Sequence, residues 1–270
     1  PGFGVKWKAR SAVPPGANIR RAGEDVTAGA VVLRRGTTVR PQEIGLLAGL
    51  GRTSVRVVRR PRVAILSTGD ELAQPGEDAA PGQIYDSNSP ALAAMVARYG
   101  GVPFVLGVAR DEAAAIRRRL QDAVDANLLL TSAGVSAGDY DLVKDVLSSM
   151  GRIDFWTVRM RPGKPLAFGR IKIGGREVPL LGLPGNPVAS LVAFEQFARP
   201  AILKMLGKTN LEKPTVQAVS ESRIENPSAC RLFVRVLVEK EGGCYRARVT
   251  GPQGSGVLTN VSSVWGRITT

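Results

Sequence analysis

The sequence predicts an α/β fold in which a three-layer α/β/α domain is followed by a small β module. Between residues 61 and 207, short apolar segments alternate with longer segments of helical periodicity. This alternation is typical of right-handed crossovers between mostly parallel strands, with helices on both faces of the sheet. After Gly207 the helical pattern stops. The predicted division is therefore 1–60, 61–207 and 208–270.

The region before residue 61 alternates short β-like segments with turns. Residues 41–51, PQEIGLLAGLG, predict a short helix with Pro41 in its first turn and Gly51 just past its end. Residues 53–60, TSVRVVRR, predict a strand.

In the central domain, three apolar segments predict strands: RVAILST (62–68), VPFVLGVA (102–109) and NLLLTSA (127–133). Each is followed by a predicted helix, over residues 87–100, 111–126 and 139–151. Ser87 or Ser89 is expected to cap the first helix. Ile116, Leu120 and Val124 recur at four-residue steps on one face of the second.

The rest of the chain predicts a hairpin, a long helix and further strands. Residues 165–185 predict the hairpin, and residues 186–207 predict a helix interrupted near Pro200. Residues 215–224 and 231–250 predict the strands of the small β module, with a tight turn at KEGG, residues 240–243.

Composition excludes several classes of protein and site. Histidine is absent and there are two cysteines, which excludes Ser-His-Asp and Cys-His catalysis and leaves too few soft ligands for a zinc site. A bound metal is therefore expected to be a hard, oxygen-bound cation. No run of about 18 apolar residues occurs, so neither a membrane span nor a membrane partner is expected.

The formal net charge of +14 favours an anionic partner. The arginines are dispersed, aromatic residues make up 5% of the chain, and no RNA-binding motif or zinc finger accompanies them. Small phosphate-bearing molecules are therefore favoured over nucleic acid, and a nucleic-acid binder stays the alternative.

A polar loop follows each of the first three predicted strands of the central domain. These loops are STGDE (67–71), ARDE (109–112) and TSAGVSAGDYD (131–141). Since the carboxyl ends of parallel strands meet at one edge of a sheet, the three loops are expected to line one site. The third loop combines hydroxyls, glycines and a helix N-terminus, which favours an oxyanion site.

The acidic residues of these loops can be interpreted as functional groups or as helix caps. Glu71, Asp111, Asp139 and Asp141 would bring carboxylates to one edge of the sheet, yet Asp111 and Asp139 are also good N-caps for the helices that follow them. Two stiff segments favour a functional site. Prolines and glycines recur in both, at positions where a simple loop between two elements needs none: RMRPGKPLAFG (159–169) and GLPGNPVAS (182–190).

Taken together, these motifs closely resemble the MoeA/gephyrin E-domain family, the molybdopterin molybdenumtransferases. The resemblance extends over about residues 17–258 and includes GANIRRAGEDV, PRVAILSTGDEL and GQIYDSN besides the loops above. It implies a MogA-like molybdopterin-binding domain over 61–207, a partial N-terminal linker domain over 1–60 and an incomplete C-terminal β domain over 208–270. It also implies that the chain lacks a large N-terminal part and the last C-terminal strands of the family pattern.

The resemblance further implies a transferase reaction. Family members take molybdate and adenylylated molybdopterin, release AMP and leave molybdenum on the pterin dithiolene, with Mg²⁺ assisting. They are cytoplasmic homodimers without nucleic-acid or membrane partners. Binding without catalysis, in a molybdopterin-binding or scaffold module, is the alternative within this resemblance.

The family's site residues carry over position by position. Glu71, Asp111 and Asp141 match its catalytic acidic positions, with Glu71 and Asp141 holding the metal. The expected substrate-binding residues are Thr131, Ser132, Gly134, Ser136, Lys144, Arg161, Lys164, Pro184, Asn186 and Pro187.

Two positions depart from the family pattern. Ala133 stands where many members carry glycine, and Thr157 stands where lysine is frequent. If the backbone at Ala133 has a positive φ, the alanine costs on the order of 1 kcal/mol.

Overall fold

The computed structural model describes residues 12, 14–135, 142–226 and 229–261. Its contacts divide the chain into two compact units, residues 1–56 and 57–270. In the first unit the predicted helix is confirmed as α1 (Pro41–Gly49). The Arg40 side chain donates hydrogen bonds to Glu43 in its first turn, at 2.6 and 3.1 Å, and they lower the pKa of Glu43 to about 2.

The second unit is built on a six-stranded mixed sheet. In spatial order its strands are β4 (Val102–Ala109), β1 (Arg62–Thr68), β5 (Leu128–Ser132), β9 (Arg176–Leu183), β8 (Pro165–Ile173) and β6 (Gly151–Thr157). The first four are mutually parallel, while β8 is antiparallel to both of its neighbours. The parallel strands predicted from the sequence are therefore adjacent.

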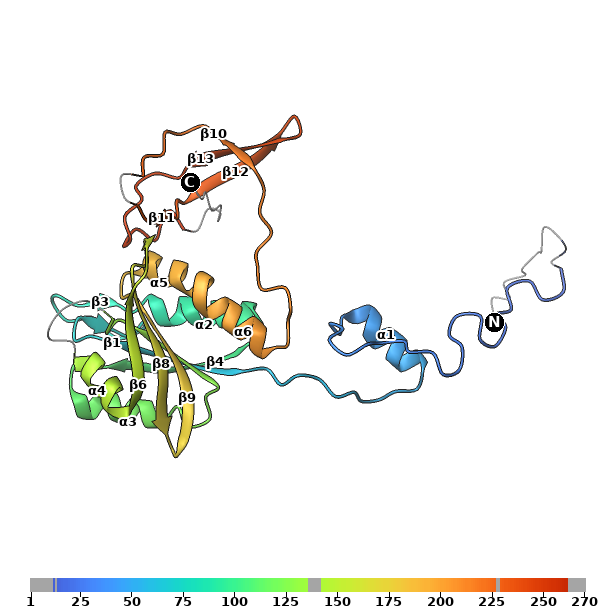
Figure 1. The fold of residues 1–270 in the computed structure, drawn as a ribbon, viewed down its shortest axis with the longest axis horizontal. Coiled ribbons are helices and arrows are strands. Elements are labelled where there is room, and N and C mark those ends of the chain that lie inside the picture. The colour runs from blue at the N-terminus through green and yellow to red at the C-terminus, as the bar shows by residue number, and fades with distance from the viewer. Residues whose placement is uncertain (1–11, 13, 136–141, 227–228, 262–270) are drawn as a thin grey trace, which may run out of the picture. The chain divides into compact units, whose positions relative to one another are not determined.

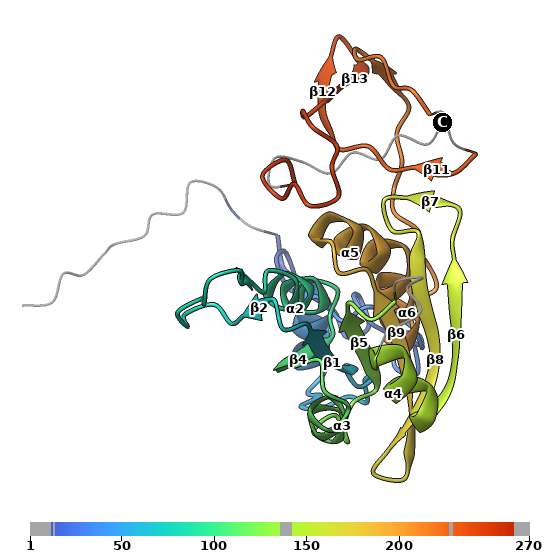
Figure 2. The same ribbon diagram turned by 90° about the vertical axis from the view of Figure 1, so that its left-hand side faces the viewer.

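Helices cover both faces of this sheet, which confirms the three-layer α/β/α architecture (Figures 1 and 2). One face carries α2 (Asn88–Arg98), α5 (Pro187–Ala193), the π-helix η1 (Phe194–Ala198) and α6 (Arg199–Met205). The other face carries α3 (Ala113–Gln121) and α4 (Leu142–Met150). Successive β1 residues alternate between the two cores, as the period of a strand requires: Val63 and Ile65 pack in one, Ala64 and Leu66 in the other.

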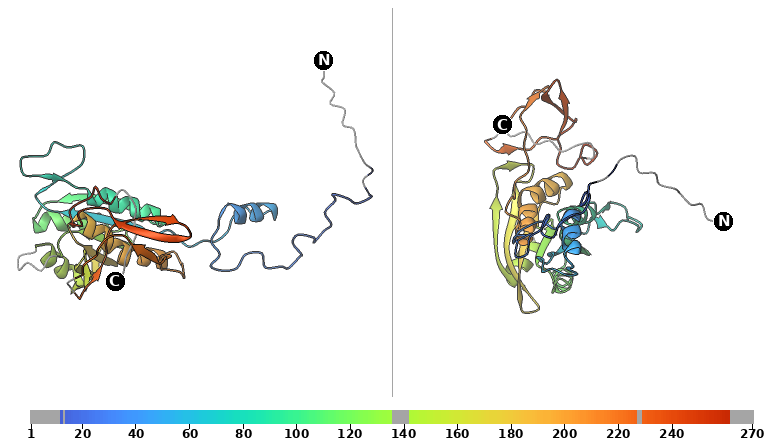
Figure 3. Two further views of the ribbon diagram at one scale, coloured as in Figure 1. Left: turned by 90° about the horizontal axis from the view of Figure 1, so that it is seen from above. Right: turned by 90° about the vertical axis from the view of Figure 1, so that its right-hand side faces the viewer.

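The C-terminal region forms a three-stranded sheet of β10 (Ala218–Ser220), β13 (Cys244–Val249) and β12 (Val236–Glu241). Gly242 and Gly243 turn β12 into β13 with φ angles of 56° and 87°, which confirms the predicted tight turn. Two short ribbons complete the unit: β11 (Arg231–Leu232) with β7 (Met160–Arg161), and β2 (Leu72–Ala73) with β3 (Ile84–Tyr85). The β8–β9 hairpin extends beyond the helices at the far end of the sheet from this module (Figures 2 and 3).

Several sequence predictions differ from the structure. The strand predicted over residues 53–60 is wrong: these residues are exposed and pair with no strand in the part of the chain that the structure describes. The helix over 186–207 departs from α-helical geometry just before Pro200, in the π-helical turn η1, but it continues through this turn and does not end there. Strand β6 was not predicted, although Ile153 and Phe155 pack inward at the period of a strand.

Helix capping also differs. Ser87 holds the N-cap position of α2, as predicted, but its side chain makes no capping hydrogen bond. The Asp86 carboxylate accepts instead from the backbone N–H groups of Asn88 and Ser89, at 3.0 Å each. The N-cap of α3 is Glu112 and not Asp111. The boundaries at residues 60 and 207 stay predictions. None of the described helices is long and apolar enough to span a bilayer.

Candidate functional site

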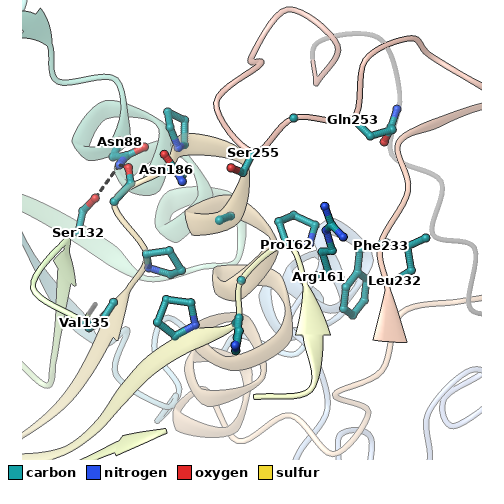
Figure 4. Close-up of a pocket in the computed structure, with 18 of the residues that line it drawn as sticks. Asn88, Ser132, Val135, Arg161, Pro162, Asn186, Leu232, Phe233, Gln253 and Ser255 are labelled. Carbon is teal, nitrogen blue, oxygen red and sulfur yellow. Dashed lines mark hydrogen bonds between the residues drawn. The ribbon is translucent and has the colours of Figure 1, made fainter. Parts of the chain in front are cut away.

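The loops that follow β1 and β4, and the described start of the loop after β5 (residues 133–135), lie at one edge of the sheet, as predicted. Asp111 donates its backbone N–H to Asp70 at 3.2 Å, so the loops after β1 and β4 are in contact. The Asn88 side chain, at the start of α2, donates to the Ser132 hydroxyl at the end of β5, at 2.7 Å (Figure 4). The carboxyl ends of the parallel strands thus bring together segments that are far apart in the sequence.

A cleft of about 1060 Å³ opens at this edge and continues to the C-terminal module. Eight of the residues predicted to form the site line it: Glu71, Ser132, Gly134, Arg161, Lys164, Pro184, Asn186 and Pro187. Leu232 of β11 and Gln253 lie on its opposite wall (Figure 4), and the segment around Arg223 also lines it. The roles assigned to these residues stay predictions.

Three predicted residues are not in the lining. Thr131 is fully buried, as are the other residues of β5, which lies in the interior of the domain. Asp111 lies on the exposed loop after β4, and Lys144 places its Nζ 5.1 Å from the centre of the Phe155 ring. The predictions for Ser136 and Asp141, and the N-cap role of Asp139, fall outside the described residues.

The backbone that follows β5 is unusual. Ala133 has a φ of 91° and Gly134 a φ of 74°. A positive φ at Ala133 is the case in which alanine costs on the order of 1 kcal/mol relative to glycine. The Ala133 N–H donates to the carbonyl of Leu183 at 3.1 Å, which ties this turn to β9. A Cβ on Gly134 would collide with the Val143 side chain of α4. Gly134 is therefore required by the packing of α4 as well as by its φ.

The turn from Arg161 to Lys164 presents two cations to the cleft. Gly163 has a φ of 100°, which favours glycine there. The Lys164 carbonyl accepts from the N–H of Val158 at 2.7 Å, and the Arg161 carbonyl accepts from the N–H of Phe233 at 2.8 Å. The C-terminal module therefore holds this basic turn in place.

The sequence did not predict the contribution of the C-terminal module. Gln253, Gly254 and Ser255 line the cleft, and Ser255 accepts a hydrogen bond from the backbone of α5. Arg235, 5% exposed, donates to the carbonyls of Pro252 and Gly254 at 2.8 and 3.2 Å and so supports this loop. Burial lowers the pKa of Arg235. An arginine inside the apolar segment LFVRVLV was the available signal.

The carboxylates of the cleft do not by themselves form a metal site. Glu71 and Glu225 both line it, and Glu225 is paired with Arg223 at 2.9 Å. Within the described ranges, no group of three or more histidine, cysteine, aspartate or glutamate side chains is placed to hold a metal ion. Asp141, the expected partner of Glu71, falls outside those ranges, so the Mg²⁺ site stays a prediction.

Comparison with known proteins identifies the family of this chain. Three family models match the chain: the probable molybdopterin binding domain over residues 64–204, the MoeA N-terminal region (domain I and II) over 4–51, and the MoeA C-terminal region (domain IV) over 217–269.

The chain is 41% identical over 241 residues to molybdopterin molybdenumtransferase 2 of Mycobacterium tuberculosis, covering 87% of this chain and 58% of that protein. It is 40% identical over 201 residues to the molybdopterin molybdenumtransferase of Haemophilus influenzae, covering 74% and 49%. The chain thus spans about half the length of these curated relatives.

A solved structure agrees with this assignment. The molybdopterin biosynthesis MoeA protein from Pyrococcus horikosii matches with a TM-score of 0.76 and 31% identity, covering 92% of this chain and 59% of that one. Since the central domain model matches more than half of the chain and MoeA regions flank it on both sides, the chain belongs to the MoeA family.

Proposed function

We propose that this chain acts as a molybdopterin molybdenumtransferase in molybdenum cofactor biosynthesis. In this reaction molybdenum passes from molybdate to adenylylated molybdopterin, and AMP is released. The observation that carries the proposal is the cleft, in which Arg161 and Lys164 lie in the same lining as the Ser132 hydroxyl. The sequence relatives that bear this activity in their names support it.

The cleft has the charge and size that such substrates need. Arg161 and Lys164 would neutralise phosphate or molybdate oxygens, and Ser132 would supply a hydrogen bond. The volume of about 1060 Å³ is slightly above the range of typical ligand sites, which suits a molecule with two ring systems.

The finer features of the proposal rest on the family resemblance. Glu71, together with Asp141, would hold Mg²⁺, which neutralises charge on the phosphoanhydride when it is bound. Asp111 would complete the acidic set. We further propose that the chain works as a homodimer in the cytoplasm, without nucleic-acid or membrane partners.

The test is molybdate-dependent AMP release from adenylylated molybdopterin. Lys164→Met should lower this rate about tenfold or more, because it removes a charge-assisted contact to the substrate. Lys172→Met is the matched control, since Lys172 is exposed near the other end of β8 and should leave the rate unchanged. Equal rates for the two variants would contradict the role of Lys164, and no AMP release by the unaltered chain would contradict the activity.

A non-catalytic molybdopterin-binding module is the second candidate. It is favoured by the acidic lining: among the described residues, Glu71 and Glu225 are the carboxylates that line the cleft, and Glu225 is paired with Arg223. Tight binding of the adenylylated pterin with no release of AMP would establish this alternative.

A further inference from the structure

Asn88 lines the cleft and connects three segments there. It lies at the start of α2 and is 8% exposed. Its Nδ2 donates to the Ser132 Oγ and to the Gly185 carbonyl, at 2.7 Å each. The backbone N–H of Asn88 is in turn held by the Asp86 carboxylate at 3.0 Å. Both the position and the rotation of this side chain are therefore fixed.

The chemistry of its neighbours fixes which end of the amide faces them. The Gly185 carbonyl can only accept a hydrogen bond, so the Asn88 atom that faces it must be the nitrogen. This nitrogen also faces Ser132, and both of its hydrogens are used by these two contacts. The Ser132 Oγ is therefore the acceptor in its contact with Asn88.

A hydroxyl that accepts at one side still has its own hydrogen to donate. The structure gives Ser132 Oγ no acceptor among the described residues, and Ser132 lines the cleft. Its backbone is paired on both sides, with Ser67 of β1 and Leu183 of β9. Ser132 is 2% exposed, so its free hydrogen can serve only an acceptor that reaches the lining of the cleft at this point.

We propose that Asn88 is a positioning residue, which makes the Ser132 hydroxyl a hydrogen-bond donor to a tetrahedral oxyanion of the substrate. The proposal rests on the proposed function and names the group that this part of the cleft recognises. The oxyanion is either the phosphate of the adenylyl group or molybdate. A ligand ammonium group would gain nothing from this donor, because it has no lone pair to accept a hydrogen bond.

Binding of AMP, adenosine and molybdate, each alone, tests the proposal by calorimetry on the full chain. Ser132→Ala should weaken the binding of AMP or of molybdate about tenfold, which is the usual effect of losing a hydrogen bond to an anion. Adenosine, which carries no phosphate, should bind unchanged. The oxyanion whose affinity falls is the one that Ser132 contacts.

Asn88→Asp should weaken the same anion at least as much, because a carboxylate accepts from Ser132 and repels the ligand. Asn127→Asp is the matched control: Asn127 accepts from the Arg62 N–H at the opposite end of β5, at 2.8 Å, and this change should leave anion binding intact. Asn88→Ala, with thermal unfolding as a check on folding, covers the case in which the aspartate disturbs the domain.

Coupling separates positioning from a structural role. If Asn88 acts through Ser132, adding Asn88→Ala to Ser132→Ala should weaken anion binding no further. Additive losses, equal losses for adenosine and AMP, or unchanged anion binding in Ser132→Ala would each overturn the proposal. These binding measurements do not need AMP release, so they stay decisive even if the proposed activity fails.

Discussion

Ala133 carries backbone strain that a single substitution can relieve. Its φ of 91° lies in the left-handed region, which residues with a Cβ rarely adopt. Ala133→Gly should stabilise the protein by about 1 kcal/mol, and urea unfolding measures this change. Ala114→Gly is the control of opposite sign: Ala114 is exposed in α3, where glycine should cost about 0.5–1 kcal/mol.

A destabilised Ala133→Gly variant would show that the turn after β5 does not keep this conformation in solution. Strain of this kind tends to occur where a backbone serves a ligand, and Ala133 lines the cleft. The sequence predicted this cost only conditionally, because φ at one position depends on the turn that its neighbours impose. Here the neighbours are Gly134 and the Leu183 carbonyl.

At the scale of elements, the π-helix η1 supports a buried ionic network. Glu195, 7% exposed, accepts from the Tyr99 hydroxyl at 2.7 Å and pairs with Arg199 and Lys213 at 3.3 and 2.7 Å. Burial and the hydrogen bond to Glu195 raise the pKa of Tyr99 to about 12. Lys213 belongs to the segment that leads into the C-terminal module, so the network anchors this segment to the α/β domain.

Glu195→Gln should destabilise the protein by about 2 kcal/mol, because it leaves the buried Arg199 guanidinium without its counter-ion. Glu177→Gln is the matched control, since Glu177 pairs with Arg170 at 3.3 Å while both side chains are exposed, and it should cost less than about 1 kcal/mol. Chemical unfolding of both variants measures the difference. Equal losses would mean that the Glu195 network contributes no more than a surface pair.

The elements that the sequence predicted are those with strong local patterns. The strands β1, β4 and β5 are continuous apolar segments, and α2 and α3 repeat apolar residues at helical spacing. Strand β6 has weaker alternation, and its identity depends on pairing with β8, which no local pattern encodes. Residues 53–60 show the reverse case: β-branched residues predicted a strand, but none of the described strands pairs with them.

The same distinction applies to the candidate site. Loops at the ends of parallel strands could be predicted, since the topology alone brings them to one edge of the sheet. The opposite wall could not, because the β11–β7 pair brings Arg231 next to Met160 across a long separation in the sequence. Arg235 is the exception, because an arginine within the apolar segment LFVRVLV is visible in the sequence.

For the whole molecule, the net charge of +14 is compatible with small anions and with nucleic acid, so the position of the cations must separate the two. Surface cations such as Arg118 on α3 are exposed and absent from the cleft, whereas Arg161 and Lys164 line it. Long-range attraction of anions would come from all of these charges, but direct contacts to a bound small anion would come from the cleft.

Salt titrations of the two kinds of ligand should therefore differ. A DNA interface with six or more phosphate contacts loses about a thousandfold in affinity between 50 and 200 mM salt, because counterions are released. AMP has no condensed counterions, so its affinity should fall by no more than about tenfold over the same range.

Arg118→Ala should leave AMP binding unchanged, whereas Arg161→Ala should weaken it about tenfold. Nanomolar binding of duplex DNA with a steep salt slope, reduced by Arg118→Ala, would instead support a nucleic-acid function for the basic surface.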